Sequence, residues 1–155
     1  MVLELSLITV VLVAVVLVAV TVVIRGVGST YWIRFLIHRY ETHDGYWKAR
    51  AVFPVLMSTA LVLLMLHVLE VLLWALIYLW LVPDDQLQSL EQVVYFSIIT
   101  FTTVGYGDIT LESGWRLLSG IEALNGILLV GWTTALFFSV LQRVWKAARQ
   151  EYDAG

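Results

Sequence analysis

The chain of 155 residues contains no cysteine, only two prolines and few charged side chains. Without cysteine it can form neither a disulfide bond nor a thiolate metal site. Charged residues make up 14% of the sequence and hydrophobic residues 61%, whereas a soluble domain carries about 25% charged residues. The apolar residues also gather in runs too long for a soluble core, so the composition predicts an integral membrane protein.

The first apolar run, residues 2–24, carries one charge, Glu4, at its edge. At about 1.5 Å per residue it spans roughly 34 Å as a helix, which is enough to cross a bilayer. In lipid a lone segment must satisfy its own backbone hydrogen bonds, which favours a helix despite the many valines. Because it lacks a basic start and a cleavage site, residues 1–24 are predicted to be a retained, additional transmembrane helix.

A cytoplasmic basic connector is predicted for residues 25–50. Gly26, Gly28 and Ser29 are expected to break the preceding helix. The segment 31–40 mixes aromatic residues with arginine and histidine, and it is too short and too charged to span the membrane. This pattern favours a short interfacial helix, with a helical extension packed on neighbouring helices as the alternative.

Two further apolar runs predict transmembrane helices at residues 51–81 and 114–145, followed by a short cytoplasmic tail at 146–155. The first of these helices would measure roughly 46 Å, so it must tilt or extend beyond the hydrocarbon. With the N-terminal helix they make three spans. The predicted fold class is therefore an all-α membrane protein.

A shorter helical segment, residues 86–102, lies between these two helices. Asp85 with Gln88, and Ser89 with Gln92, both have the spacing of a capping box, so either pair could start the helix. From either cap the helix would measure roughly 20–25 Å, which is too short to cross comfortably. A half-helix followed at once by glycine-containing backbone is typical of a re-entrant loop.

Lysine and arginine are distributed unevenly over the connections. The connector 25–50 holds five of them and the tail region holds Arg143, Lys146 and Arg149, whereas the connector 82–114 holds none. By the positive-inside rule, the basic segments lie in the cytoplasm and the connector 82–114 lies outside. This orientation puts the N-terminus outside and the C-terminus in the cytoplasm.

The most unusual segment is Thr102–Asp108, with the sequence TTVGYGD. Irregular polar backbone at membrane depth persists only where it is buried in protein or lines a watery cavity. Glycines at positions 105 and 107 would let alternate residues adopt conformations that L-residues avoid, so that successive carbonyls point the same way. Rings of such oxygens can replace the hydration shell of a monovalent cation, which the C-terminal dipole of the half-helix would attract.

These residues resemble the selectivity filter of potassium channels of the prokaryotic two-helix-plus-pore-loop family, T-V-G-Y-G followed by Asp. The resemblance extends from Pro83 to about Arg143, with residues 51–81 as the outer helix of a pore domain at 51–145. It implies a filter at 103–107 that binds K⁺, closed at its inner end by the Thr103 hydroxyl. The ions would be coordinated by the carbonyls of Thr103, Val104, Gly105 and Tyr106, and Gly107 completes the filter.

The resemblance also implies the assembly and its surroundings. One chain supplies one filter strand and four strands are needed to ring an ion, so a homotetramer is expected. It would lie among the lipids of a prokaryotic plasma membrane and would be a transport protein rather than an enzyme. K⁺ in the filter is the one bound species expected, with no organic cofactor and no nucleic-acid partner.

Four residues beside the filter are assigned supporting roles by the same resemblance: Thr102, Asp108, Tyr95 and Phe96. Tyr95 and Phe96 would brace the filter tyrosine, with lipid-facing aromatics as the alternative. In several family members an acidic residue four positions before the filter threonine pairs with the aspartate. Here that position is Ile99, so this brace is expected to be absent.

The last long helix carries candidate hinge and gate residues: Gly126, Gly131, Thr134 and Phe138. Either glycine could let the helix bend, and close helix packing is an equal alternative for both. With Gly126 aligned to the family's hinge glycine, Thr134 and Phe138 fall on the cavity side. Phe138 is then a candidate hydrophobic constriction, against a plain packing role.

Polar residues inside the predicted spans form a second candidate site: His67 with Glu70, and Glu122 with Asn125. Each pair shares a helical face, and both lie at similar depths by residue count, so a buried cluster near the filter base is predicted. Three interpretations stay open: a pH-sensitive clamp behind the filter, a static hydrogen-bonded network, and a metal site. The last is the weakest because H-x-x-E supplies only two ligands.

The predicted function is passive, K⁺-selective conduction, with modulation by this cluster as a further expectation. A weakly selective cation channel and a non-conducting membrane assembly subunit are the alternatives. A membrane metalloenzyme built on His67, Glu70 and Glu122 is a further competitor, but the chain offers it neither a convincing ligand set nor a nucleophile.

Overall fold

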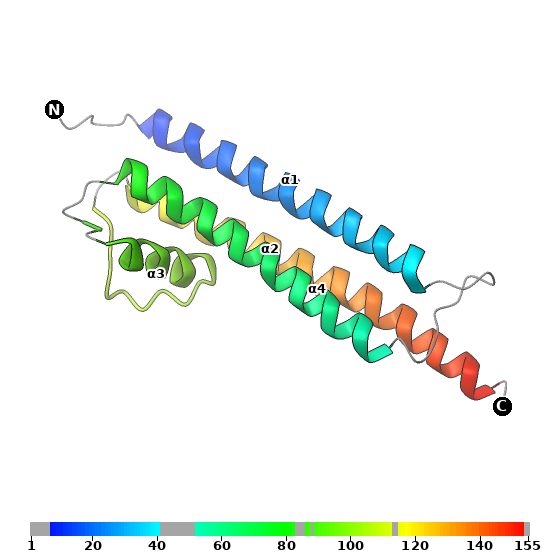
Figure 1. Cartoon of the computed structure of the whole chain (residues 1–155). Coiled ribbons are helices and arrows are strands. Elements are labelled where there is room, and N and C mark those ends of the chain that lie inside the picture. The colour runs from blue at the N-terminus through cyan, green and yellow to red at the C-terminus, as the bar shows by residue number, and fades with distance from the viewer. Residues whose placement is uncertain (1–6, 41–51, 83–85, 88, 113–114, 154–155) are drawn as a thin grey trace. The chain divides into compact units, whose positions relative to one another are not determined.

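The computed structural model describes residues 7–40, 52–82, 86–87, 89–112 and 115–153. They form four helices: α1 (Leu7–Tyr40), α2 (Val52–Leu81), α3 (Leu90–Phe101) and α4 (Trp115–Asp153) (Figure 1). In α1, α2 and α4 there are stretches long and apolar enough to cross a membrane, whereas α3 is a short apolar helix. The predicted all-α fold with three spans is confirmed.

The predicted break after residue 24 is wrong, because α1 continues through Gly26, Gly28 and Ser29 to Tyr40. A glycine inside a helix costs about 1 kcal/mol relative to alanine. At Gly28 that cost is offset by close packing, since a Cβ atom there would lie 2.8 Å from a methyl carbon of Leu66. Residues 31–40 are thus a helical extension, which was the alternative interpretation.

The bounds of α2 and α4 lie closer to the predicted bounds than the end of α1 does. α2 matches the predicted outer helix to one residue, and residue 51 lies outside the described part of the chain. α4 runs on to Asp153 instead of ending at 145. Its predicted first residue, 114, also lies outside the described residues, so the difference concerns the C-terminal end.

α3 begins later than predicted, at Leu90, because Ser89 is its N-cap. The Ser89 side chain accepts a hydrogen bond from the backbone N–H of Gln92 at 3.2 Å, as a capping box requires. The alternative cap, Asp85 with Gln88, lies outside the described residues. With 12 residues, α3 measures about 18 Å and cannot cross a bilayer.

The chain divides into two compact units, each with its own apolar core. The first unit comprises Met1–Val23 and His67–Val130, and its core draws on all four helices. The second comprises Ile24–Leu66 and Gly131–Gly155. The core of the second unit is formed by Leu36, Val55, Leu63, Leu136, Val140 and Val144.

Three polar residues lie four apart on the buried face of α1: Thr21, Arg25 and Ser29. In the first unit, Thr21 Oγ1 accepts a hydrogen bond from Asn125 Nδ2 of α4 at 2.9 Å. In the second unit, Arg25 Nη1 donates to Thr133 Oγ1 of α4 at 2.9 Å and also lies 3.5 Å from the Leu63 carbonyl oxygen. Buried hydrogen bonds therefore tie α1 to α4 in each unit.

Candidate functional site

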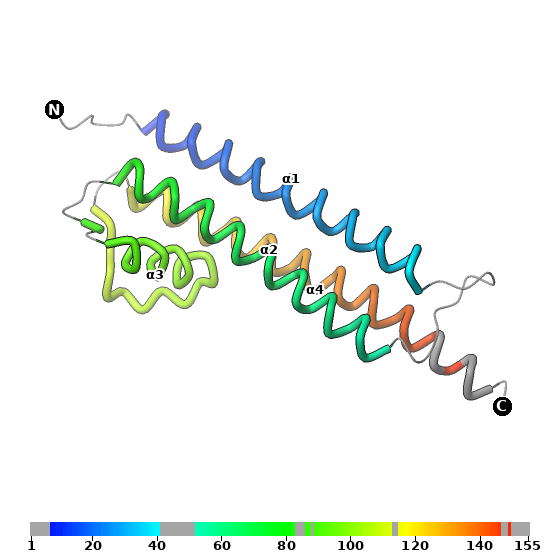
Figure 2. Tube along the Cα trace, in the orientation of Figure 1, coloured from blue at the N-terminus to red at the C-terminus, as the bar shows by residue number. Residues whose placement is uncertain are grey.

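The segment after α3 has an alternating backbone. Thr103, Gly105 and Gly107 have φ angles of +60°, +51° and +79°. No other non-glycine residue in the described part of the chain has a positive φ, so Val104 and Tyr106 lie on the ordinary side of the Ramachandran map. Figure 2 shows this segment as the loop that leads from the end of α3 towards α4. Left-handed conformations therefore occur at every second position.

This alternation has a chemical consequence. When every second residue is left-handed, neighbouring peptide groups turn so that their carbonyl oxygens can face one side. Such a row of oxygens has the donor chemistry that hard monovalent cations prefer. Thr103 was not predicted to be left-handed, since the argument from sequence relied on the two glycines.

The C-terminal end of α3 anchors the segment. The backbone N–H of Thr103 donates to the Thr100 carbonyl at 3.0 Å, and that of Gly105 donates to the Ile99 carbonyl at 3.1 Å. The Thr102 hydroxyl donates to the Ile98 carbonyl at 2.7 Å. The carbonyls of Ile98, Ile99 and Thr100 thus accept hydrogen bonds from the alternating segment, residues 103–107, and from Thr102, and these bonds fix the start of the segment against α3.

Two side chains on the segment face outward in the single chain. Val104 is 52% exposed and Tyr106 is 74% exposed. Within a single chain, neither apolar side chain of the segment is therefore covered.

A hydrogen bond that was not predicted from the sequence joins α3 to Asp108, the residue after the alternating segment. The Tyr95 hydroxyl of α3 donates to Oδ2 of Asp108 at 2.8 Å. Ile99, at the position of the missing acidic brace, is buried instead. Tyr95 therefore holds the aspartate in place of a carboxyl partner, a role different from the predicted bracing of Tyr106.

The Tyr95–Asp108 bond has a measurable signature. The hydrogen bond to Asp108, with smaller contributions from desolvation and the nearby charge, raises the pKa of the Tyr95 phenol above its usual value of 10.0. The stabilisation that this hydrogen bond gives to the folded protein is therefore present at neutral pH, and it is lost only as the pH rises through the raised pKa of Tyr95. Tyrosinate absorbance of wild type minus Tyr95→Phe should show this titration, and Asp108→Asn should move it down towards 10.0. An unchanged midpoint in Asp108→Asn would contradict the bond.

Phe96 is a core residue. It is 4% exposed, and its ring lies edge-on to Tyr78 of α2 with the centroids 5.2 Å apart. It therefore joins α3 to α2 and does not face lipid.

The two candidate hinge glycines differ sharply. A Cβ atom on Gly126 would lie 1.8 Å from the carbonyl oxygen of Phe101, whereas nothing lies within 4 Å of one on Gly131. Gly126 is thus a close-packing position, where α4 touches the last residue of α3. Phe138 is 53% exposed and Thr134 is exposed as well.

The four residues of the predicted polar cluster all lie within the first unit. His67 Nδ1 lies 3.4 Å from Oε2 of Glu70, and the His67 ring meets Phe101 edge-on at 5.9 Å. Asn125 is bonded to Thr21 of α1, as described above. No three His, Cys, Asp or Glu side chains among the described residues could hold a metal ion.

Glu122 has partners that the sequence did not suggest. Its Oε2 accepts a hydrogen bond from the Tyr78 hydroxyl of α2 at 2.7 Å, and its Oε1 lies 2.6 Å from the Ser97 hydroxyl of α3. All three residues are fully buried. Tyrosine and serine carry no charge, so they were not among the charged partners expected for Glu122.

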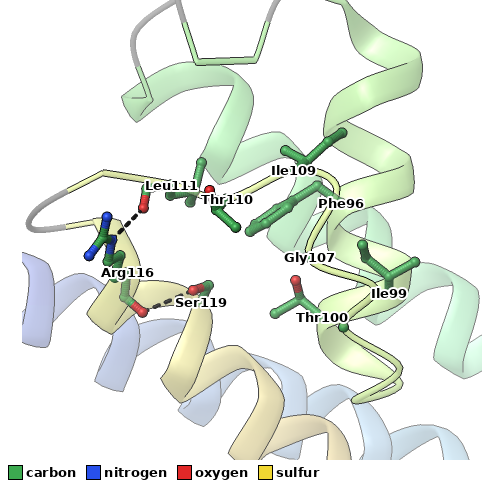
Figure 3. A pocket seen from close by; sticks show the side chains of 10 residues that line it. Phe96, Ile99, Thr100, Gly107, Ile109, Thr110, Leu111, Arg116 and Ser119 are labelled. Atoms are coloured by element: carbon green, nitrogen blue, oxygen red, sulfur yellow. Dashed lines mark hydrogen bonds between the residues drawn. The ribbon is translucent and has the colours of Figure 1, made fainter.

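A cavity of about 360 Å³ lies beside the alternating segment, residues 103–107 (Figure 3). Gly105 and Gly107 form part of its wall, with Phe96 and Ile99 of α3 and Arg116 of α4. Arg116 Nε donates to the Leu111 carbonyl at 2.8 Å, which fixes the chain just before α4. The cavity is therefore shared by the alternating segment and the first turns of α4.

Comparison with known proteins identifies the same region. A protein-family model described as Ion channel matches residues 50–143, more than half of the chain. The match takes in α2, α3, the alternating segment and most of α4, and it leaves α1 outside. No curated protein and no solved structure matches.

Proposed function

Because the chain belongs to the ion channel family, we propose that it is a potassium channel that passes K⁺ down its gradient through a filter at residues 103–107. The observation that carries this proposal is the alternation of positive φ at Thr103, Gly105 and Gly107. This backbone can turn the carbonyls of Thr103, Val104, Gly105 and Tyr106 towards one axis, where they would replace the water around K⁺. The Thr103 hydroxyl would close the inner end.

A homotetramer follows from this chemistry, since one strand cannot surround an ion. The exposed Val104 and Tyr106, together with the cavity behind the segment, support such an assembly. In a single chain these features leave apolar side chains and space unfilled, and neighbouring subunits would cover both. Asp108, held by Tyr95, would stand at the outer mouth, with Thr102 and Phe96 supporting the filter from α3.

The conduction path would continue along α4. Ile127, Val130, Thr134 and Phe138 are all exposed in the single chain, which a cavity-lining face requires. Gly131, with open space around it, is the better hinge candidate, and Phe138 is the candidate constriction. By the positive-inside rule the C-terminus would lie in the cytoplasm and the N-terminus outside, and the proposed location is a prokaryotic plasma membrane.

Ion flux into proteoliposomes tests this function. We expect uptake of rubidium or thallium that barium blocks, with little uptake of sodium. Equal sodium and rubidium uptake would favour a weakly selective cation channel. No uptake of any ion would favour a non-conducting assembly subunit and would overturn the proposal.

The possible modulation by the buried polar residues is part of the proposal. His67 contacts both Glu70 and the Phe101 ring at the end of α3. A change in the distance or protonation of the His67–Glu70 pair would therefore shift the end of α3 next to the proposed filter. Currents of Glu70→Gln across pH test this coupling. A conductance and pH response equal to wild type would remove it.

A further inference from the structure

The hydrogen bonds around Glu122 cannot all be formed with the hydrogens that Tyr78 and Ser97 supply. There are three contacts: Tyr78 Oη to Glu122 Oε2 at 2.7 Å, Ser97 Oγ to Glu122 Oε1 at 2.6 Å, and Ser97 Oγ to the Val71 carbonyl oxygen at 3.0 Å. Each contact needs its own hydrogen. The two hydroxyls bring one each, and the carbonyl brings none. The remaining hydrogen has to come from the Glu122 carboxyl.

The surroundings of Glu122 agree with this count. Glu122, Tyr78 and Ser97 are each 0% exposed. Within the described residues, the contacts of Glu122 are to these two uncharged hydroxyls, and none is to a lysine, arginine or histidine. A carboxylate in such a place would be a buried charge without a compensating cation, which is strongly unfavourable.

We propose that Glu122 is a neutral carboxylic acid and a positioning residue that acts as both donor and acceptor. Tyr78 donates to one carboxyl oxygen, the other carboxyl oxygen donates to Ser97, and Ser97 donates to the Val71 carbonyl. This chain of hydrogen bonds starts on α2, passes through α4 and α3, and returns to α2. Every polar atom in it is satisfied without any charge.

The position of Ser97 on α3 indicates what the hydrogen-bond network does. Ser97 lies on α3 next to Phe96, which packs on the same Tyr78, and α3 carries the filter from its last carbonyls. The network therefore fixes the helix that holds the filter, and this part of the inference rests on the proposed function. Losing one bond of the network would let α3, and the filter with it, move relative to α2 and α4.

Infrared spectroscopy of the purified protein in lipid tests the protonation directly. Wild type should show the C=O stretch of a protonated carboxylic acid at neutral pH, and Glu122→Gln should lack it. Tyr78→Phe should shift this band to higher frequency, because the carbonyl oxygen loses its donor. If the wild-type and Glu122→Gln spectra coincide in the acid region, Glu122 is a carboxylate and the proposal is overturned.

Ion selectivity tests the positioning role. Glutamine keeps one donor and one acceptor, so Glu122→Gln should keep the ratio of rubidium to sodium uptake within about twofold of wild type. Ser97→Ala and Tyr78→Phe each leave a buried partner unsatisfied, and we expect relative sodium uptake to rise about tenfold. Matched controls are Ser119→Ala, whose hydroxyl bonds only within α4, and Tyr31→Phe, whose side chain is 69% exposed.

The outcomes separate this inference from the proposed function. If Glu122→Gln loses selectivity as fully as Ser97→Ala, a charge and not a donor is needed, and the proposal fails. An unchanged ratio in Ser97→Ala also refutes the positioning role. A wild-type protein without flux would overturn the channel function, while the infrared result, which needs no conduction, would still decide the state of Glu122.

Discussion

Replacing Gly126 with alanine should abolish ion flux and lower the stability of the protein by about 3 kcal/mol or more. The new Cβ atom would lie 1.8 Å from the carbonyl oxygen of Phe101 and 2.8 Å from its carbonyl carbon. Both atoms are backbone, so no side chain can swing away, and α4 must separate from the end of α3. Because the alternating segment is bonded to that end of α3, the proposed filter would be displaced. Thermal unfolding and rubidium uptake of the reconstituted protein measure the two effects.

Gly120→Ala is the matched control for this prediction. It makes the same substitution six residues earlier in α4, where nothing lies within 4 Å of the added atom. Since alanine is the better helix former by about 1 kcal/mol, this variant should be at least as stable as wild type. Equal behaviour of the two variants would show that the contact between α4 and Phe101 does not govern stability.

The second large effect is expected from Gly105→Ala. There is open space around Gly105 in the single chain, so the cost is one of backbone conformation and not of collision. Its φ of +51° costs an L-residue about 1–2 kcal/mol, which would make roughly 4–8 kcal/mol over the four chains of the proposed tetramer. The segment would relax by turning a peptide group away, and rubidium uptake should fall to background.

Protein assembly distinguishes this failure from misfolding. Gly105→Ala should still fold and assemble, because nothing in the single chain lies within 4 Å of the added atom, and size-exclusion chromatography checks this. A variant that assembles and conducts like wild type would mean that the left-handed φ at this position has no role in ion passage.

Much of this architecture was predictable because membrane spans and the half-helix follow from local sequence. Runs of apolar residues set three spans, and the Ser89/Gln92 capping pair set the start of α3. The wrong prediction of a helix break at Gly28 has a tertiary cause. Glycine is a helix breaker only when nothing compensates, and here Leu66 packs where a side chain would stand.

In the candidate site, too, features that depend on local sequence were predictable and features that depend on tertiary contacts were not. Glycines in TTVGYGD predicted backbone of unusual conformation, and positive φ at Gly105 and Gly107 confirmed it. The partners of Glu122 were not predictable in this way, since Tyr78 and Ser97 lie 44 and 25 residues away and carry no charge. Nor could spacing distinguish Gly126 from Gly131, because only the contact with Phe101 separates them.

The hydrogen bonds between α1 and α4 also set an order of events in the synthesis and folding of this protein. Thr21 is bonded to a residue 104 positions later, and Arg25 to one 108 positions later. At about 5–20 residues per second, a ribosome needs roughly 5–20 s to reach Thr133 after Arg25. During that interval α1 is complete while both of its partners on α4 are still unmade. Docking of α1 onto α4 is therefore a late event in biogenesis, although α1 precedes the other three described helices in the chain.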